Sequence, residues 1–588
     1  MLESGGKINN RPQRCRHKTS QFVREVRRRE FAKFLAAIAK SNVTVQEKHS
    51  RPIFQSKFLN MGKVDWRDYS RRLLNVVFSF IQYLFQLFFG IVYGGEKESM
   101  PSIKDVLLLD SASTIAMKIR TGKITSEQVL DSFIERIKEV NPILNCVVAD
   151  RFEEAKKEAQ AADELIKSGT VSQETLAKEK PFLGVPFTTK DCIAVKGLIH
   201  SAGLYCRKHI RAESDAVVVT RLKQAGAIPI GLTNVSELCM WWESANNVHG
   251  RTNNPYDTSR IVGGSSGGEG CAQASAASAF GIGSDIGGSI RMPAYFNGVF
   301  GHMPTPLTVP LNGQYPEPFT EEQRKFLRIG PLCRRSEDIL PLLKVITNNL
   351  PALRLDESVD LKKIKFHYQE CDTGAKLVSA VAPEIRELFS KITKHLEKAH
   401  GIKTNKVHLK RFSKSAPMWF ANMKSPSGPT FAEQLTNLNG RVSPWWELVR
   451  WLVGKSNHCF IALATCIMEK GGCSYGDKKY QYLVKERDVF RLEMLDLLGD
   501  DGVLLYPTHP TSAPYHNQPL VKPFNFSYTG IINVLKLPAT NIPMGLDSTG
   551  LPIGIQVIAN EYNDRLCLAV ARELEKAFGG WVPPEVQA

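Results

Sequence analysis

Gly263-Gly264-Ser265-Ser266-Gly267-Gly268 and Asp285-Ile286-Gly287-Gly288-Ser289-Ile290-Arg291 are the two stretches that decide how this sequence is interpreted. They place two serines, each framed by glycines, 24 residues apart. Glycine allows backbone conformations that are closed to other residues, so a substrate carbonyl can approach main-chain N–H groups closely. Such N–H groups form an oxyanion hole. A flexible Gly/Ser linker is the alternative, but apolar and charged residues interrupt these glycines. The pattern therefore predicts a hydrolase.

A serine nucleophile needs a base, and neither glycine-rich stretch contains a histidine. About 75 residues before Ser265, residues 184–191 form a short apolar run that ends in Lys190 and Asp191, which is typical of a buried strand. Taken alone, Lys190 is expected to be a solvated lysine. The base must come from a segment outside both stretches.

Taken together, Lys190, Ser265 and Ser289 resemble the catalytic triad of the amidase signature family, in which a lysine, a serine in a cis peptide and a nucleophilic serine form one relay. The resemblance runs from about Leu107 to the C-terminus. Within the family, the chain most resembles the membrane-anchored fatty acid amide hydrolases, particularly the second type. The stretches that carry the resemblance are residues 236–241, 253–257, 263–270, 283–293, 537–557 and 575–582. Residues 301–304 depart from the family, because most members carry a lysine before the proline, where this chain has Met303.

The resemblance implies a role for each residue of the site. Neutral Lys190 would take a proton through Ser265 from Ser289, which attacks the amide carbonyl. A lysine base must be neutral, so Lys190 needs burial or a cationic neighbour to lower its pKa from about 10.4. The expected oxyanion-binding groups are the main-chain N–H groups of Ser289 and of Ile286, Gly287 and Gly288. The residues expected to orient the two loops are Ser266, Asp285 and Arg291.

The resemblance also implies an activity. The chain is expected to cleave primary fatty amides and N-acylethanolamines to a fatty acid and an amine through an acyl-enzyme. Two alternatives stay open within the family: a general amidase, and an amidotransferase A-type subunit that hands ammonia to a partner. A membrane-tethered binding protein on an inactive hydrolase scaffold is the alternative from another class. The expected partners are a lipid amide substrate, a membrane and a second copy in a homodimer.

The charge and the cysteine pattern exclude other classes of protein. The net charge is +17, but residues 1–72 hold 18 basic and 6 acidic residues and so account for +12. The basicity therefore belongs to an N-terminal extension, and we expect no nucleic-acid partner. Twelve cysteines include no Cys-x-x-Cys pair, and thirteen histidines include no His-Glu-x-x-His motif. We therefore expect no metal and no cofactor.

Three regions follow from composition: a basic extension at 1–70, a transmembrane or membrane-anchoring helix at 71–95, and a catalytic domain at 96–588. Residues 73–93 carry no charge and, at about 1.5 Å per residue, would cover a hydrocarbon core of about 30 Å. Asn75, Gln82 and Gln86 are costly in lipid, so an interfacial or core helix is the alternative. The expected location is an endomembrane such as the endoplasmic reticulum or a lipid droplet.

Hydrophobic periodicity predicts an α/β catalytic domain with a mixed central β-sheet flanked by helices on both faces. Strands are expected at 185–188, 227–230, 503–506 and 553–558, and a helix at 564–576. Thr125 and Gln128 form a capping box for another helix, which Asn141-Pro142 should end. Residues 443–453 concentrate Trp445, Trp446 and Trp451 on a short amphipathic segment, for which an interfacial anchor and a buried core helix both stay open.

Overall fold

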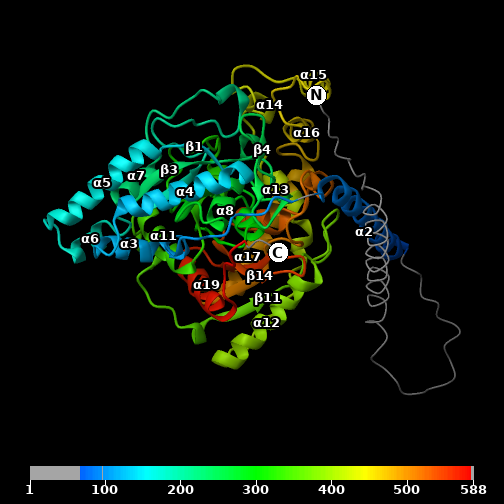
Figure 1. Ribbon diagram of the computed structural model, residues 1–588. Helices are drawn as coiled ribbons and strands as arrows, with labels where there is room; N and C mark the ends of the chain where they lie inside the picture. The colour runs from blue at the N-terminus through cyan, green and yellow to red at the C-terminus, as the bar shows by residue number, and fades with distance from the viewer. Residues whose placement is uncertain (1–65, 96, 470, 585–588) are drawn as a thin grey trace, which may run out of the picture. The chain divides into compact units, whose positions relative to one another are not determined.

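The computed structural model describes residues 66–95, 97–469 and 471–584. The chain divides into two compact units, residues 1–74 and residues 75–588. Most of the first unit, including the predicted basic extension up to residue 65, lies outside the described residues. The fold and the contacts given below are those of the second unit (Figure 1).

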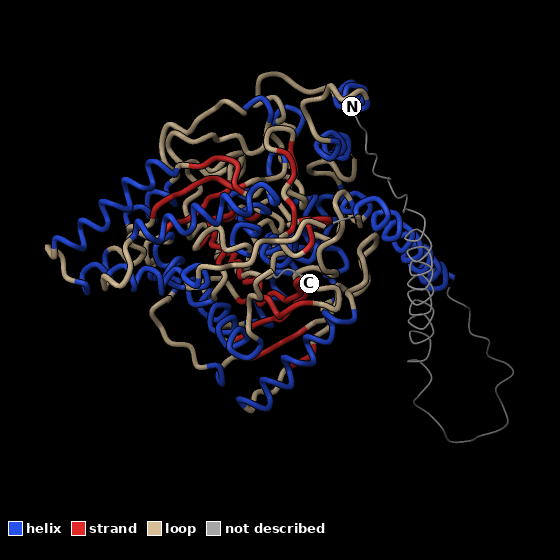
Figure 2. The backbone as a smooth tube through the Cα atoms, viewed as in Figure 1, coloured by secondary structure: helices blue, strands red, loops and turns tan. Residues whose placement is uncertain are grey.

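A mixed sheet of eleven strands forms the centre of this unit, in the order β1-β3-β2-β8-β10-β9-β14-β15-β13-β11-β12. Strand β2 pairs in parallel with β3 and β8, and β11 pairs in parallel with β12 and β13, whereas the other pairs are antiparallel. The strands run through the interior and helices surround them (Figure 2). The strand bounds are β1 Val147–Asp150, β2 Pro186–Lys190, β3 Ile228–Thr233, β8 Phe280–Asp285, β9 Phe300–Met303, β10 Arg328–Cys333, β11 Lys365–Tyr368, β12 Asn405–Lys406, β13 Gly502–Pro507, β14 Ala539–Leu546 and β15 Pro552–Ala559.

Helices form most of the connections between these strands. Their bounds are α2 Trp66–Tyr93, α3 Ala112–Arg120, α4 Ser126–Leu144, α5 Phe152–Ser168, α6 Gln173–Glu179, α7 Val217–Gln224, α8 Gly267–Ala274, α9 Arg291–Phe296, α10 Glu321–Phe326, α11 Ile339–Ile346, α12 Pro383–His400, α13 Ser415–Asn422, α14 Phe431–Gln434, α15 Pro444–Leu452, α16 Phe460–Glu469, α17 Lys478–Leu498, α18 Ser527–Val534 and α19 Asp564–Phe578. Two short hairpins, β4 Ala245–Asn246 with β5 Gly250–Arg251 and β6 Asn253–Asn254 with β7 Asp257–Ile261, lie outside the main sheet.

The predicted elements are present, and one boundary was wrong. Strands β2, β3, β13 and β15 and helix α19 begin within one residue of the positions that the hydrophobic pattern indicates. The capping box of Thr125 and Gln128 starts α4, but this helix continues through Pro142 to Leu144. Asn145 then adopts a left-handed conformation with φ of 50°, and the Asn141 side chain accepts hydrogen bonds from the next two backbone N–H groups. A proline in the last turn interrupts little of the hydrogen-bond ladder, so it does not end the helix.

Helix α2 contains the segment for which a membrane span was one expectation. Among the described helices, none is long and apolar enough to cross a membrane. Two glutamines of α2 have partners elsewhere in the second unit: Gln82 accepts a hydrogen bond of 3.2 Å from Ser379 Oγ, and Gln86 accepts one from Gln518. The apolar residues that remain exposed on the same helix are Val77, Phe80, Ile81, Leu84, Phe85, Leu87, Phe88, Ile91 and Val92.

Helix α15 contains the three neighbouring tryptophans. Trp445 and Trp446 are 65% and 62% exposed, and Trp451 is 41% exposed. Their exposure rules out the buried core helix that was one of the two expectations for this segment.

Candidate active site

Strand β2 delivers Lys190 to the interior of the unit. All five residues of this strand are buried, because the strand lies between β3 and β8 in the sheet. Lys190 Nζ lies 2.7 Å from Ser265 Oγ, 3.1 Å from Ser284 Oγ and 3.2 Å from the Ser284 carbonyl oxygen. Among the described residues, no carboxylate forms an ion pair with Lys190. The lysine and the first serine of the predicted relay are therefore in direct hydrogen-bond contact.

The first glycine–serine loop leads into helix α8. The Gly264–Ser265 peptide bond is cis, and Ser265 is buried. Gly268 lies in the first turn of α8, where a β-carbon would come within 2.4 Å of the Asn234 backbone nitrogen. Glycine is therefore required for the close approach of this loop to its neighbour.

The second loop follows strand β8 and carries Ser289, which is 7% exposed. Gly288 has a φ of +119°, and a β-carbon there would lie 1.9 Å from Thr529 Oγ1, so only glycine fits. Ser266 joins the two loops: its backbone N–H donates to the Ser289 carbonyl at 3.2 Å, and its hydroxyl donates to the Ser284 carbonyl at 3.3 Å. No hydrogen bond links Ser265 Oγ with Ser289 Oγ in the described structure, but both serines line one cavity.

The amide N–H groups of the second loop differ in their partners. The Gly288 N–H donates to Asp285 Oδ1 at 2.7 Å, so it is already occupied. Within the described residues, the N–H groups of Ile286, Gly287 and Ser289 have no hydrogen-bond acceptor. Unpaired backbone N–H groups in a buried loop are rare, because each costs free energy comparable to a lost hydrogen bond. Three of them in one loop can bind a developing oxyanion.

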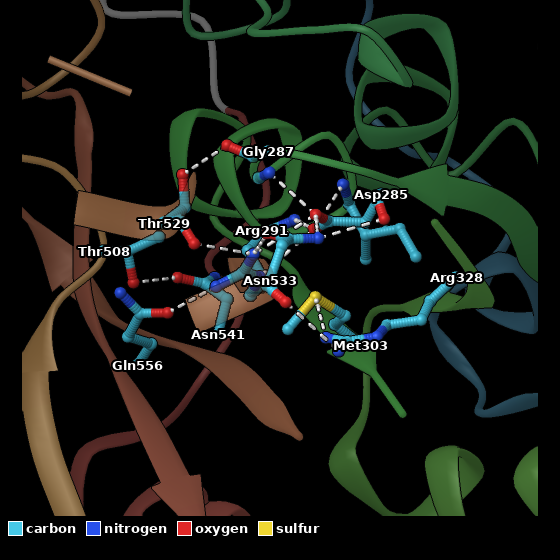
Figure 3. A network of polar contacts seen from close by, with 12 residues as sticks. Asp285, Gly287, Arg291, Met303, Arg328, Thr508, Thr529, Asn533, Asn541 and Gln556 are labelled. Carbon is cyan, nitrogen blue, oxygen red and sulfur yellow. Dashed lines mark hydrogen bonds and ion pairs between the residues drawn. The ribbon is translucent and has the colours of Figure 1, made fainter. Parts of the chain in front are cut away.

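Asp285 and Arg291 hold this loop in place (Figure 3). Arg291 Nε lies 3.1 Å from Asp285 Oδ2, and one terminal nitrogen lies 3.1 Å from Oδ1. Burial would raise the pKa of Asp285, but the charge and hydrogen bonds of Arg291 outweigh it and lower the pKa to about 2. Arg291 also donates to Gln556 Oε1 at 2.9 Å and to Asn533 Oδ1 at 2.6 Å. The loop is thus tied to α18 and β15.

Several residues of the site escaped the sequence analysis. Glu269 on α8 is fully buried and lies 2.9 Å from Thr188 Oγ1 and 2.8 Å from Thr233 Oγ1. Burial raises the pKa of Glu269 to about 8, despite these hydrogen bonds, so the carboxyl is protonated at neutral pH. Trp419 on α13 donates from Nε1 to the Ile286 carbonyl at 3.0 Å. Of these two residues, only Glu269 lies next to a recognised motif, the first glycine–serine stretch. The sequence therefore offered a signal for Glu269 but none for Trp419.

The chain departs from the family pattern at Met303, the residue before Pro304. Met303 is buried in β9, and its sulfur lies 3.2 Å from a terminal nitrogen of Arg328. The neighbouring residue is His302. It lies in β9 and is buried, with Nδ1 2.8 Å from Thr540 Oγ1 and Nε2 3.1 Å from Asp564 Oδ1. These partners belong to β14 and α19, so His302 fills a structural position in the sheet.

A cavity of about 80 Å³ opens beside the two serines. Its lining combines Ser265, Ser284, Ser289 and Ile286 with the side chains of Leu238, Cys239, Met240, Gln314, Pro316, Glu317, Pro318, Phe319, Gln323, Leu327, Met423 and Gln434. Small-molecule sites usually enclose about 300–1,000 Å³. The cavity reaches Ser289 but is too small to hold a long acyl chain in this conformation.

Comparison with known proteins identifies the family. The sequence profile of the Amidase family matches residues 128–568. Fatty-acid amide hydrolase 2 of Homo sapiens is 46% identical over 504 residues, which cover 84% of this chain and 94% of that protein. A glutamyl-tRNA(Gln) amidotransferase subunit of Caldanaerobacter subterraneus is 28% identical over 475 residues, 78% of this chain and 94% of that protein. The structure of 6-aminohexanoate cyclic dimer hydrolase shares the fold, with a TM-score of 0.66, 22% identity, and coverage of 82% of this chain and 100% of that chain. The lysine–serine contact and the glycine–serine loops thus lie in an amidase fold, and the chain belongs to the amidase family, as a homologue of fatty-acid amide hydrolase 2.

Proposed function

We propose that this chain hydrolyses fatty acid amides through an acyl-enzyme formed on Ser289. The observation that carries the proposal is the contact between Lys190 and Ser265 beside a loop with three unoccupied amide N–H groups. The 46% identity to a fatty-acid amide hydrolase supports the choice of substrate class over other amides.

In the proposed mechanism, Ser289 Oγ attacks the amide carbonyl and its proton passes to Ser265. Ser265 in turn gives its own proton to the neutral amine of Lys190, which lies 2.7 Å away. The contacts of Lys190 with Ser284 hold the amine in position for this transfer. The proton then returns through Ser265 to the leaving nitrogen, and a water molecule hydrolyses the acyl-enzyme.

We assign the oxyanion hole to the N–H groups of Ile286, Gly287 and Ser289. Gly288 was expected to contribute a fourth, but its N–H already donates to Asp285. Its proposed role is to give the loop the left-handed turn that orients the other three donors. One such donor is typically worth about 3–4 kcal/mol of transition-state stabilisation.

A long acyl chain requires the cavity beside Ser289 to widen. The side chains that separate the 80 Å³ space from the surroundings include Met240, Phe319 and Met423, which belong to three distant segments. Methionine side chains rearrange at low cost because they are unbranched and flexible. We infer that substrate entry displaces these side chains.

Hydrolysis of a long-chain primary amide or N-acylethanolamine by detergent-solubilised protein tests the proposal. We expect turnover in the wild type and no acylation in Ser289→Ala, with Ser390→Ala, on an exposed position of α12, as the matched control. A fluorophosphonate probe should label the wild type and fail to label Ser289→Ala.

The same assay separates the alternatives. Turnover of short polar amides only would favour a general amidase. Hydrolysis of glutamine that depends on a partner complex would favour an amidotransferase role. Absence of both probe labelling and turnover in the wild type would contradict the proposal and favour an inactive binding scaffold.

We also propose that the protein lies on a membrane surface through α2 and α15. Gln82 and Gln86 of α2 accept hydrogen bonds from Ser379 and Gln518, and the exposed apolar side chains of the helix remain for another surface. On α15, Leu452 is 75% exposed beside the two exposed tryptophans, and Arg450 and Lys455 flank them. Apolar and aromatic side chains next to basic residues are typical of helices that lie in a lipid interface. An endomembrane such as the endoplasmic reticulum or a lipid droplet is the proposed location.

Binding to anionic liposomes tests the membrane proposal. Replacing Trp445, Trp446 and Trp451 together by alanine should weaken sedimentation with liposomes and leave turnover of a soluble short amide intact. Leu492→Ala, on an exposed position of α17, is the control. Unchanged liposome binding in the triple variant would exclude α15 from the interface.

A further inference from the structure

A cluster of two histidines and one glutamate lies on elements that the catalytic site does not use. His395 and His400 are on α12, and Glu573 is on α19. His395 Nε2 lies 2.8 Å from Glu573 Oε1, and His400 Nε2 lies 2.6 Å from the same oxygen. The side chains are 25%, 24% and 12% exposed, respectively. Three ligand-type atoms therefore meet at one half-buried point, and all lie within 4.8 Å of one another.

The geometry is close to that of a tetrahedral metal site. Zinc binds imidazole nitrogens and carboxylate oxygens at about 2.0–2.2 Å, which places neighbouring ligand atoms about 3.3 Å apart. The two nitrogen–oxygen distances here are shorter than this value by less than 1 Å. Small rotations of the three side chains would therefore open the cluster enough to admit an ion.

The two carboxylate oxygens of Glu573 differ in their hydrogen bonds, and this difference favours a metal site. Both imidazoles contact Oε1 of Glu573, whereas Oε2 has no hydrogen-bond partner among the described residues. The rings of His395 and His400 meet edge to face, with an interplanar angle of 81° and centroids 5.8 Å apart, and both Nε2 atoms approach the same carboxylate oxygen. Phe578 packs against the His395 ring at 5.5 Å and supports its orientation.

An open cavity of about 600 Å³ adjoins the cluster and provides the route for an ion and for a fourth ligand. It is lined by His400, Gly401 and strand β11, and by Lys362, Lys365 and Lys403. The positive charges of these lysines repel a cation, but water in the open cavity screens this repulsion. The same charges favour an anion as the fourth ligand. We propose that His395, His400 and Glu573 bind a zinc ion that links α12 to the C-terminal helix α19, with water or a small anion in the fourth position.

No metal was expected from the sequence, because the cysteines and histidines do not show the short spacings of known zinc motifs. Glu573 follows His395 and His400 by 178 and 173 residues. The cluster exists only because α12 and α19 lie close together in the fold, at the end of the unit where Figure 1 labels both.

Titration of chelator-treated full-length protein with Co²⁺ tests the proposal, because tetrahedral Co²⁺ gives visible absorption bands that octahedral Co²⁺ lacks. We expect one Co²⁺ per chain, displaced by Zn²⁺, and an increase in melting temperature on adding Zn²⁺. His395→Ala, His400→Ala and Glu573→Gln should each weaken Co²⁺ binding by at least about 100-fold, more than the 10–100-fold typical of groups outside the coordination sphere.

His367→Ala is the matched control, because His367 lines the same cavity but is not part of the cluster. This variant should bind Co²⁺ as the wild type does. Amide hydrolysis and the far-ultraviolet circular dichroism spectrum show that each variant is folded. The proposal is overturned if the wild type shows no tetrahedral bands at stoichiometric Co²⁺, or if folded His400→Ala and Glu573→Gln keep them.

Discussion

Two fully buried carboxyl groups flank the proposed active site, and they are in opposite states. Asp285 is paired with Arg291 and has a pKa lowered to about 2, so it is ionised. Glu269 has only neutral hydrogen-bond partners, the hydroxyls of Thr188 and Thr233 and the side chain of Gln273, and burial raises its pKa to about 8. The difference shows that the partner, and not burial, decides whether a carboxyl in this interior carries charge.

The neutral Glu269 and the ionised but paired Asp285 have the same electrostatic consequence for Lys190. A protonated Glu269 carries no charge, and Arg291 neutralises Asp285. Neither carboxyl therefore presents an unbalanced negative charge to Lys190, whose proposed role requires a neutral amine. The polar groups in contact with Lys190 Nζ are serine hydroxyls and a carbonyl.

Removing the partner of Asp285 gives the largest expected effect. In Arg291→Met, Asp285 becomes a buried charge without a counter-ion, and breaking a buried pair in this way typically costs about 3–5 kcal/mol. The bonds of Arg291 to Gln556 and Asn533 are also lost, so the loop that carries Ser289 is released. We expect a lower free energy of unfolding in denaturant titration, together with a lower kcat for amide hydrolysis.

Arg324→Met is the control for this experiment. Arg324 forms an exposed pair with Glu321, and such pairs contribute little, so we expect a change of about 0.5 kcal/mol or less. An Arg291→Met variant as stable as Arg324→Met would show that the ion pair does not determine the state of Asp285.

The contacts of Arg291 also show which parts of the site could be predicted from the sequence and which could not. Lys190 and Ser265 were predicted as neighbours from the resemblance to the amidase signature family, and the structure places them in contact. Asn533 and Gln556 were not predicted as partners of Arg291, because they lie 242 and 265 residues away from it. Gln556 belongs to a stretch that carries the family resemblance, but no role was assigned to it. The glycine-rich stretches indicate the loops, but the side chains that fix those loops come from segments that only the fold brings near.

The same limit applies to the fold. Strands such as β2 and β13 were located because a continuous apolar run marks a strand buried on both faces. The end of α4 was misplaced, because a proline in a last turn and an asparagine one residue earlier do not show which of them ends the helix. The order of the eleven strands follows from long-range packing and was not predicted.

Replacing Glu269 by its neutral isostere gives the next largest effect. An unfolded glutamate has a pKa of about 4.3, so between about pH 4.5 and 8 the unfolded state loses a proton that the folded state keeps. The folded-state pKa is raised, so stability is greatest below this window and falls as pH rises through it. One pKa unit corresponds to about 1.4 kcal/mol, so the wild type should lose about 3 kcal/mol between pH 5 and 7 from this group.

Glu269→Gln removes this dependence, since glutamine keeps the shape and can hydrogen-bond Thr188 and Thr233 without titrating. Denaturant unfolding at several pH values should show a flatter profile than in the wild type. Glu154→Gln, on an exposed position of α5, should leave the slope unchanged. Parallel profiles for the wild type and Glu269→Gln would mean that Glu269 is ionised in the folded protein, and the contrast with Asp285 would disappear.

Acid titration of Asp285 gives the smallest effect and has the opposite sign. The folded-state pKa of about 2 lies below the value of about 3.9 for an unfolded aspartate. The stability that Asp285 contributes is therefore fully present above about pH 4, and it is lost as pH falls toward 2. The loss amounts to about 2 kcal/mol. Asp285→Asn is less stable at neutral pH, because Arg291 is left unpaired, but its stability should fall less steeply below pH 4.

The pH dependence of stability near neutral pH and in acid together test whether hydrogen-bond and ion-pair partners determine the charge states of Glu269 and Asp285. Glu269→Gln should change the pH dependence of stability only near neutral pH, and Asp285→Asn only in acid. That result would mean that at pH 7 the same interior holds Glu269 neutral and Asp285 ionised. If Asp285→Asn keeps the full acid slope of the wild type, the acid sensitivity belongs to other carboxylates. Asp285 would then act on the loop through its hydrogen bond to the Gly288 N–H, which an asparagine oxygen can also accept.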